Sequence, residues 1–169
     1  CAQSAAVPEE APTEPVLAPT SAPIDPTPTS DPVDESLPEP HAAFARAFTD
    51  PMYADEGAEF SPFGTDEGSD TLALSAARRD KLDACTTVRS LLEADDLAAA
   101  LDSPADNGPD TDGFIVGAGF ALIYLTGHID TEGKQLTLAA LRRTSSFYAE
   151  HHPRELRVMM RDLTSFRAA

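Results

Sequence analysis

The sequence has few basic residues and no tryptophan. Its 169 residues include 12 Lys and Arg against 29 Asp and Glu, which gives a net charge of −17. Phosphate backbones and anionic lipid head groups repel a chain of this charge, so neither is expected as an electrostatic partner. We therefore predict no nucleic-acid partner, and we predict that any membrane attachment uses something other than a basic patch.

Long apolar runs are also missing. A helix needs about 18 to 20 apolar residues to cross a bilayer. The longest apolar run here, residues 114–125, contains Gly117 and Gly119 and is shorter than that. We do not expect these residues to span a membrane.

Cysteine is scarce, which argues against a disulfide scaffold. The two cysteines are Cys1 and Cys85. Cys85 lies among Leu82, Val88 and Leu91, and these apolar neighbours favour a small buried hydrophobe over a reactive thiol.

Residues 1–40 are rich in proline and acid. They hold ten of the fifteen prolines and eight acidic residues, with no Lys or Arg. Such a segment buries too little surface to offset its ordering entropy, and its prolines favour extended polyproline II conformations. We predict a disordered or extended tether.

The opening residues Cys1-Ala2-Gln3-Ser4, followed by this tether, resemble a mature bacterial lipoprotein. The resemblance implies a thioether-linked diacylglycerol on Cys1, often with a further acyl chain on its amine, and no other cofactor. Two or three acyl chains give durable anchoring. The location implied is the outer face of the cytoplasmic membrane, with lipid as the only membrane contact. A chain boundary that falls on cysteine by chance is the alternative.

After residue 40 the pattern predicts an all-α fold, a small helical bundle. We expect helices at 41–48, from 66 or 69 to 82, within 83–101, and at 114–125, 135–150 and 154–166. The 114–125 segment is apolar on nearly all sides, which predicts a central buried helix. Gly117 and Ala121 would let neighbouring helices approach it closely. A buried strand is the alternative for this segment.

We divide the chain into a tether (1–40), a short docking helix with its linker (41–56) and a helical domain (57–169). Phe44 and Phe48, at i and i+4, form the apolar face of the short helix. We expect this face to dock on the domain or on a partner, and we assign both residues to partner binding. Aromatic contacts are expected to pin the loop at 52–70.

Residues 57–72, GAEFSPFGTDEGSDTL, resemble the start of a bacterial family of uncharacterised small helical proteins. Phe63, Asp66, Gly68 and Asp70 match that family's pattern, whereas residues 59–60 depart from its Trp-Gly. The resemblance implies a helical fold and no established activity. We interpret the Asp residues as helix caps.

Residues 106–113 suggest a calcium loop because they contain Asp110, Asp112 and Gly113. When Gly113 occupies the sixth position, however, glycines fall at the first and twelfth positions, where Asp and a bidentate Glu are required. The pattern therefore does not fit a calcium site.

A second metal candidate combines His128, Asp130 and Glu132, which alternate along the chain, with His151 or His152. A solvated turn followed by a helix break explains these residues better. We predict no metal site.

The sequence contains no glycine-rich phosphate loop, no GxSxG motif and no CxxC motif, so we predict that the protein is not an enzyme. Our leading hypothesis is a non-catalytic accessory lipoprotein, with its extended tail lying along an integral membrane complex. The Ala-, Asp-, Glu- and Pro-rich composition and the layout are similar to those of the small lipoprotein subunits of actinobacterial respiratory supercomplexes of cytochromes bcc and aa3. The alternative is a free-standing envelope module that binds a small ligand, a metal or a cell-wall component, which a hydrophobic pocket would favour.

Overall fold

The computed structural model describes residues 37–167, apart from the side chains of Ala100 and Pro104. Cys1 and the predicted tether up to residue 36 lie outside this range. Within it the chain forms six α-helices and no strand, which confirms the all-α prediction. The elements are α1 (Ala42–Ala47), η1 (Pro51–Ala54), α2 (Asp66–Ala77), η2 (Arg79–Lys81), α3 (Val88–Ala94), η3 (Ala98–Leu101), η4 (Pro104–Asp106), α4 (Pro109–Thr126), α5 (Thr131–Phe147) and α6 (Arg154–Ser165).

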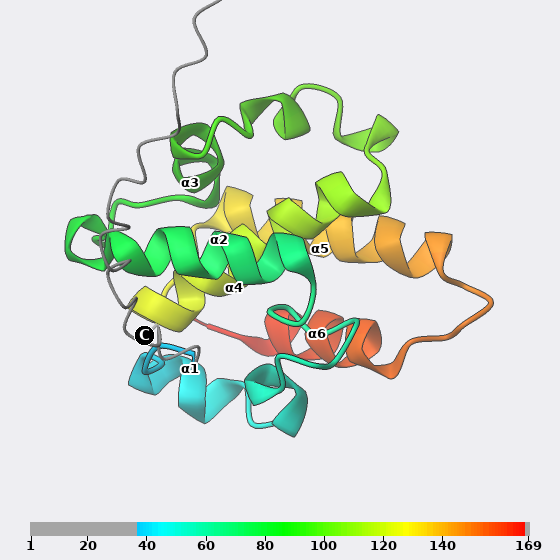
Figure 1. Ribbon diagram of the computed structural model, residues 1–169, viewed down its shortest axis with the longest axis horizontal. Helices are drawn as coiled ribbons and strands as arrows, with labels where there is room; N and C mark the ends of the chain where they lie inside the picture. The colour runs from blue at the N-terminus through cyan, green and yellow to red at the C-terminus, as the bar shows by residue number, and fades with distance from the viewer. Residues whose placement is uncertain (1–36, 168–169) are drawn as a thin grey trace, which may run out of the picture. The chain divides into compact units, whose positions relative to one another are not determined.

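Helix α4 is the centre of the bundle, as its apolar sequence predicts. Every residue from Ile115 to Leu125 is buried, and α1, α2, α3 and α5 all pack against this helix. Figure 1 shows α2 and α5 lying alongside it. Among residues 37–167 no helix combines the length and apolar character needed to cross a membrane.

Two glycines of α4 allow its neighbours to come close. A Cβ placed on Gly117 would lie 3.0 Å from the Cα of Gly68 in α2. A Cβ placed on Gly119 would lie 2.8 Å from Thr137 Cγ2 in α5, and nearer still to its hydroxyl. The prediction of close packing at Gly117 is confirmed, and Gly119 supplies a second such contact.

The starts of three helices differ from prediction. Thr65, rather than Asp66 or Ser69, caps α2 by accepting a hydrogen bond from the backbone N–H of Gly68 at 3.1 Å. Helix α4 starts at Pro109 instead of residue 114, because proline suits the first helical position and acids follow it in the first turn. Helix α5 starts at Thr131, where Asp130 accepts from the backbone N–H of Gly133 at 2.7 Å.

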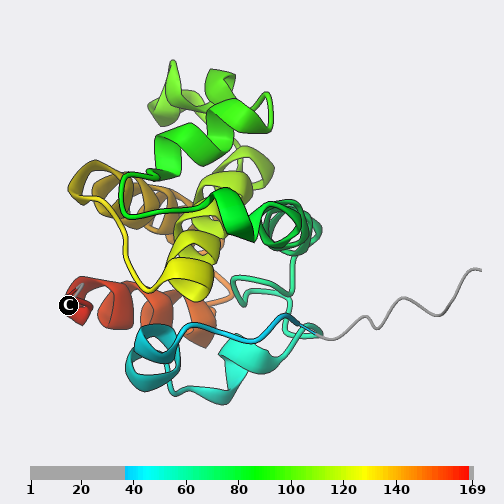
Figure 2. The ribbon, with the colours of Figure 1, turned by 90° about the vertical axis from the view of Figure 1, so that its left-hand side faces the viewer.

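The assignment of Phe44 and Phe48 to partner binding is wrong. The two rings are only 2% and 4% exposed, and they lie in the core of this chain. Phe44 contacts Tyr124 with ring centroids 4.7 Å apart, and Phe48 contacts Phe120 at 5.6 Å and Phe166 at 5.3 Å. Figure 2 shows α1 and α6 together at one end of the bundle. The short helix docks on its own domain because burying the two phenylalanine rings removes their apolar surface from water, which stabilises the fold.

The predicted boundaries at residues 40 and 56 also change. The hydroxyl of Tyr124 donates to the carbonyl oxygen of Pro38 at 2.7 Å, and Arg79 donates to that of Glu39 at 2.9 Å. Residues 37–40 and 41–56 thus belong to the same compact unit as the rest of the described chain.

Cys85 is exposed, contrary to the prediction of a buried thiol. It lies in a turn before α3, where its backbone N–H donates to Asp83 Oδ1 at 2.8 Å. Val88 and Leu91 are buried because they lie on α3 itself. Cys85 precedes α3, so it does not share the burial of the apolar residues that lie on this helix.

Candidate functional site

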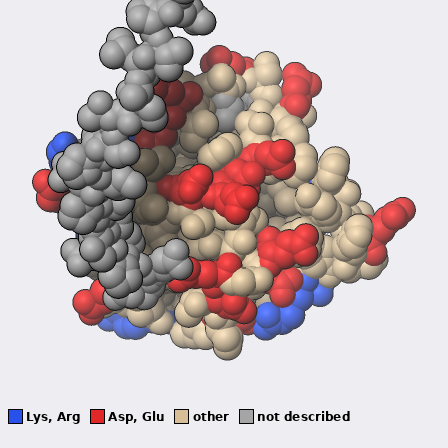
Figure 3. Space-filling view, in the orientation of Figure 1, with Lys and Arg blue, Asp and Glu red and all other residues tan. Residues whose placement is uncertain are grey.

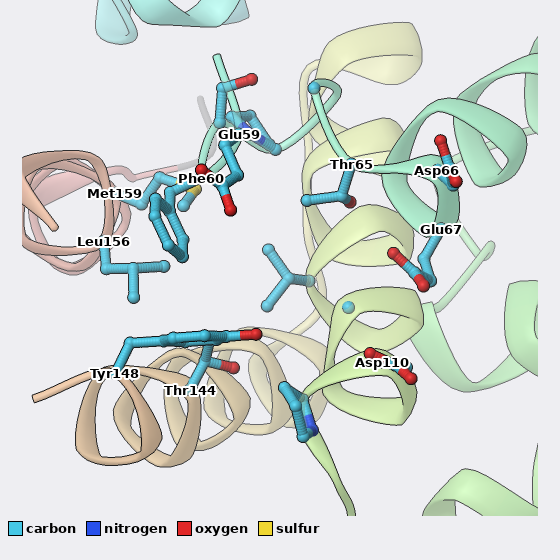
Figure 4. A pocket seen from close by; sticks show the side chains of 16 residues that line it. Glu59, Phe60, Thr65, Asp66, Glu67, Asp110, Thr144, Tyr148, Leu156 and Met159 are labelled. Atoms are coloured by element: carbon cyan, nitrogen blue, oxygen red, sulfur yellow. The ribbon is translucent and has the colours of Figure 1, made fainter. Parts of the chain in front are cut away.

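A cavity of about 290 Å³ lies between the loop before α2, the first turn of α4, the end of α5 and the start of α6. Figure 4 shows these four segments surrounding it. Small-ligand sites typically occupy clefts of about 300 Å³ upwards, lined by apolar groups with a few polar ones. The cavity is therefore large enough for a small organic ligand.

One side of the cavity is apolar. It is formed by the ring of Tyr148 after α5, the ring of Phe60 from the loop, and Leu156 and Met159 from α6. The Phe60 and Tyr148 rings meet edge to face, with centroids 5.1 Å apart and planes at 70°. In Figure 4 the Tyr148 hydroxyl extends toward the middle of the cavity. A ligand on this wall would meet two aromatic surfaces.

The other side of the cavity is acidic. Asp66, Glu67 and Asp110 line it, Glu59 lies beside Phe60 on the loop, and no Lys, Arg or His is among the lining residues. Figure 4 places Glu67 and Asp110 across the cavity from Leu156 and Met159. Figure 3 shows acidic side chains spread across the face drawn there, with basic ones along its lower edge and at its left side.

The loop that supplies Glu59 and Phe60 is held by its own hydrogen bonds. Asp55 Oδ1 accepts from the backbone N–H of Gly57 at 2.9 Å, and the Ser61 hydroxyl donates to the Asp55 carbonyl oxygen at 3.0 Å. Gly64 is required here, because a Cβ on it would lie 2.6 Å from Ser61 Oγ. These contacts fix the positions of Glu59 and Phe60 at the cavity.

Thr144 contributes an unsatisfied polar atom to the wall. It lines the cavity from α5, and its Oγ1 is buried without a hydrogen-bond partner among the described residues. Buried hydroxyls normally have a partner, because leaving one unpaired costs about 1–3 kcal/mol. A ligand with a polar group at this point would satisfy Thr144.

The predicted metal candidates do not come together. His128 Nε2 donates to the Thr86 carbonyl oxygen at 3.1 Å, Asp130 caps α5, and Asp112 pairs with Arg143. Asp110 alone lies at the cavity. Within residues 37–167 no group of three or more His, Cys, Asp or Glu side chains is arranged to hold a metal ion.

Sequence reasoning missed the cavity, although one signal was present. Residues 57–72, whose resemblance to a helical family was noted for its Asp residues, supply Glu59, Phe60, Asp66 and Glu67 to the cavity. No sequence pattern pointed to Tyr148 as a site residue, because only the tertiary fold brings its ring against Phe60.

No protein-family model, no curated protein and no solved structure matches this chain. The resemblances to lipoproteins and to the uncharacterised helical family therefore stay predictions. The cavity is the observation from which a function can be inferred.

Proposed function

We propose that the folded unit is a non-catalytic binding module for a small organic ligand, which it holds in the cavity between α2, α4, α5 and α6. This choice reverses the order of the two sequence-based hypotheses. The observation that carries it is the pairing of an apolar wall with a separate set of polar groups in one cleft. This combination is typical of sites for small molecules.

The chemistry of the wall supports binding rather than catalysis. Ser61 is the only serine on it, and its hydroxyl donates to a backbone carbonyl oxygen rather than to a general base. A nucleophilic serine needs a base within hydrogen-bond distance. The Thr144 hydroxyl has no hydrogen-bond partner within the part of the chain that the structure describes. The absence of a base next to Ser61 and of a partner for the Thr144 hydroxyl among the described residues supports a binding role.

A fragment screen by NMR tests this proposal. We expect aromatic fragments to shift the amide signals of residues around Phe60, Tyr148 and Met159 in the full-length chain. Phe60→Ala should weaken fragment binding about threefold to tenfold, because one aromatic contact contributes about 0.5–1.5 kcal/mol. The matched control is Leu74→Ala, which truncates an exposed apolar residue of α2 that does not line the cavity. Shifts that avoid the cavity, or equal losses in both variants, would refute the proposal.

A second candidate is the accessory lipoprotein, anchored through Cys1 on the outer face of the cytoplasmic membrane. It is supported by the composition of residues 1–35, which contain seven acids and no basic residue. A partner complex that binds this segment would need a basic groove.

Mild-detergent purification through a C-terminal tag tests this candidate, with wild type and Cys1→Ala compared by mass spectrometry. We expect acyl groups on Cys1 and, for an accessory subunit, stoichiometric membrane proteins with wild type only. An unacylated chain would contradict the anchor. An acylated chain that purifies alone would contradict the accessory role and leave an anchored binding module.

A further inference from the structure

We propose that the ligand of this cavity is a small amphipathic cation, an aromatic or alkyl group that carries one ammonium. This inference rests on the proposed binding function and adds to it the ligand's charge and orientation. The apolar part would lie against Phe60, Tyr148 and Met159, and the ammonium would face Glu67 and Asp110.

The ion pairs of the folded unit leave out the acidic residues of the cavity. Five arginines form ion pairs, and their partners are Asp50, Asp95, Asp112, Glu132 and Asp162. None of these five acids lines the cavity. Among residues 37–167, no ion pair involves Glu59, Asp66, Glu67 or Asp110. The folded unit thus leaves the cavity carboxylates without a cation.

The helix dipoles at the cavity offset only part of the charge of these carboxylates. Helices α2 and α4 both begin at the cavity, and each N-terminus acts as roughly half a positive charge. Together they offset about one of the four carboxylate charges. A cleft lined by uncompensated charge of one sign concentrates counter-ions of the opposite sign. The field in the cavity therefore favours a cation and disfavours an anion.

The two sides of the cavity differ in what they offer the charged end of a ligand. A cation can also bind to the face of an aromatic ring, which would put it at the apolar wall. The Phe60 and Tyr148 rings, however, contact each other edge to face at 5.1 Å, so no cation fits between them. Leu156 and Met159 complete that wall and offer no polar group. Glu59 lies beside Phe60 and is a single carboxylate on this wall, whereas Glu67 and Asp110 offer the charged end two carboxylates opposite.

Gly113 lets the Glu67 side chain lie close to the backbone of α4. A Cβ on this residue would lie 3.3 Å from Glu67 Cβ and 3.5 Å from Glu67 Oε2, so Glu67 rests directly on the bare backbone of α4. Asp110 lies one turn earlier on the same helix. The two carboxylates thus approach the cavity from two helices that pack on each other.

Three matched probes test the inference by calorimetric titration of the full-length chain: 2-phenylethylammonium, 2-phenylethanol and 3-phenylpropanoate. They share a phenyl group and differ in charge. We expect the ammonium to bind at least tenfold more tightly than the alcohol, and the carboxylate to bind most weakly. The advantage of the ammonium should shrink as salt is added, because salt screens the partly exposed carboxylates.

Variants separate specific recognition from general attraction to an acidic protein. Glu67→Gln and Asp110→Asn should each weaken ammonium binding several-fold and leave alcohol binding unchanged. Asp70→Asn is the control, because it removes the same charge from an exposed position on α2 outside the cavity. An equal loss with Asp70→Asn would overturn the inference.

The outcomes for this inference and for the binding function are distinguishable. If the alcohol binds as tightly as the ammonium, the cavity binds small ligands and the charge assignment is wrong. If none of the three probes binds while the chain is folded, both the inference and the proposed function are wrong.

Discussion

Arg143 of α5 holds the carboxylate of Asp112 with both ends of its guanidinium group: Nε donates to Oδ2 at 2.9 Å and a terminal nitrogen donates to Oδ1 at 2.6 Å. Asp112 is only 1% exposed. The pair joins the first turn of α4 to α5, next to the cavity that both helices line. It positions the start of α4, and therefore Asp110.

Asp112→Ala should lower the free energy of unfolding by about 3 kcal/mol, because it leaves the Arg143 guanidinium without its buried partner. Urea unfolding followed by circular dichroism measures this loss. Asp110→Ala is the control from the same helical turn; its side chain is exposed, so the change should stay within about 0.5 kcal/mol. Equal effects of the two substitutions would show that the pair does not anchor α4.

Gly119→Ala should destabilise the fold by about 1–3 kcal/mol, since the added methyl group collides with Thr137 across the α4–α5 contact. Thr137→Ala removes the two nearest atoms of that collision. The double variant should therefore be more stable than the sum of the two single effects predicts, which a double-mutant cycle of unfolding free energies measures. Strict additivity would contradict the packing described here.

The free energy of unfolding should fall above pH 10 because of the ionisation of Tyr53. Burial, with the nearby carboxylate of Asp162, raises the pKa of this tyrosine above its ordinary value of 10.0. Below pH 10 the side chain is neutral in both states, so its contribution is constant. At higher pH the unfolded chain releases the proton and the folded chain retains it, so the free energy of unfolding falls.

Thermal unfolding at a series of pH values tests this expectation for Tyr53. Tyr53→Phe should flatten the alkaline decline in part, because burial also raises the pKa of Tyr124, which remains in the variant. At neutral pH the variant should lose about 1 kcal/mol with the hydrogen bond to Asp162. An unchanged alkaline profile would contradict the structure around Tyr53.

Cys85 should react with a thiol reagent in the folded protein, because its side chain is exposed in the turn before α3. Labelling of the Cys1→Ala variant without denaturant, followed by mass spectrometry, reports on this thiol alone. We expect complete modification at a rate close to that of the unfolded chain. Modification only after unfolding would support the buried thiol expected from sequence.

Local patterns predicted the helical class and the central helix. The uninterrupted apolar run at 114–125 indicated burial on all sides, and Pro153 marked the start of α6, which begins at Arg154. The start of α4 at Pro109 could not be predicted from the sequence. Residues 102–113 are rich in turn-forming types, and a proline fits either a turn or the first helical position.

The candidate site could not be predicted from the sequence, because its parts meet only through tertiary packing. Phe60 and Tyr148 lie in different loops, and no periodicity relates them. The same reason explains the error at Phe44 and Phe48: their spacing shows an apolar face but not which surface covers it.

The central claim is that one cavity holds an amphipathic cation in one orientation, and intermolecular nuclear Overhauser effects test it most directly. With 2-phenylethylammonium bound to the full-length chain, we predict contacts from the phenyl protons to the methyl groups of Met159 and Leu156, and none to the exposed Leu74 and Phe147. Contacts to Leu74 or Phe147 in place of Met159 would contradict the claim.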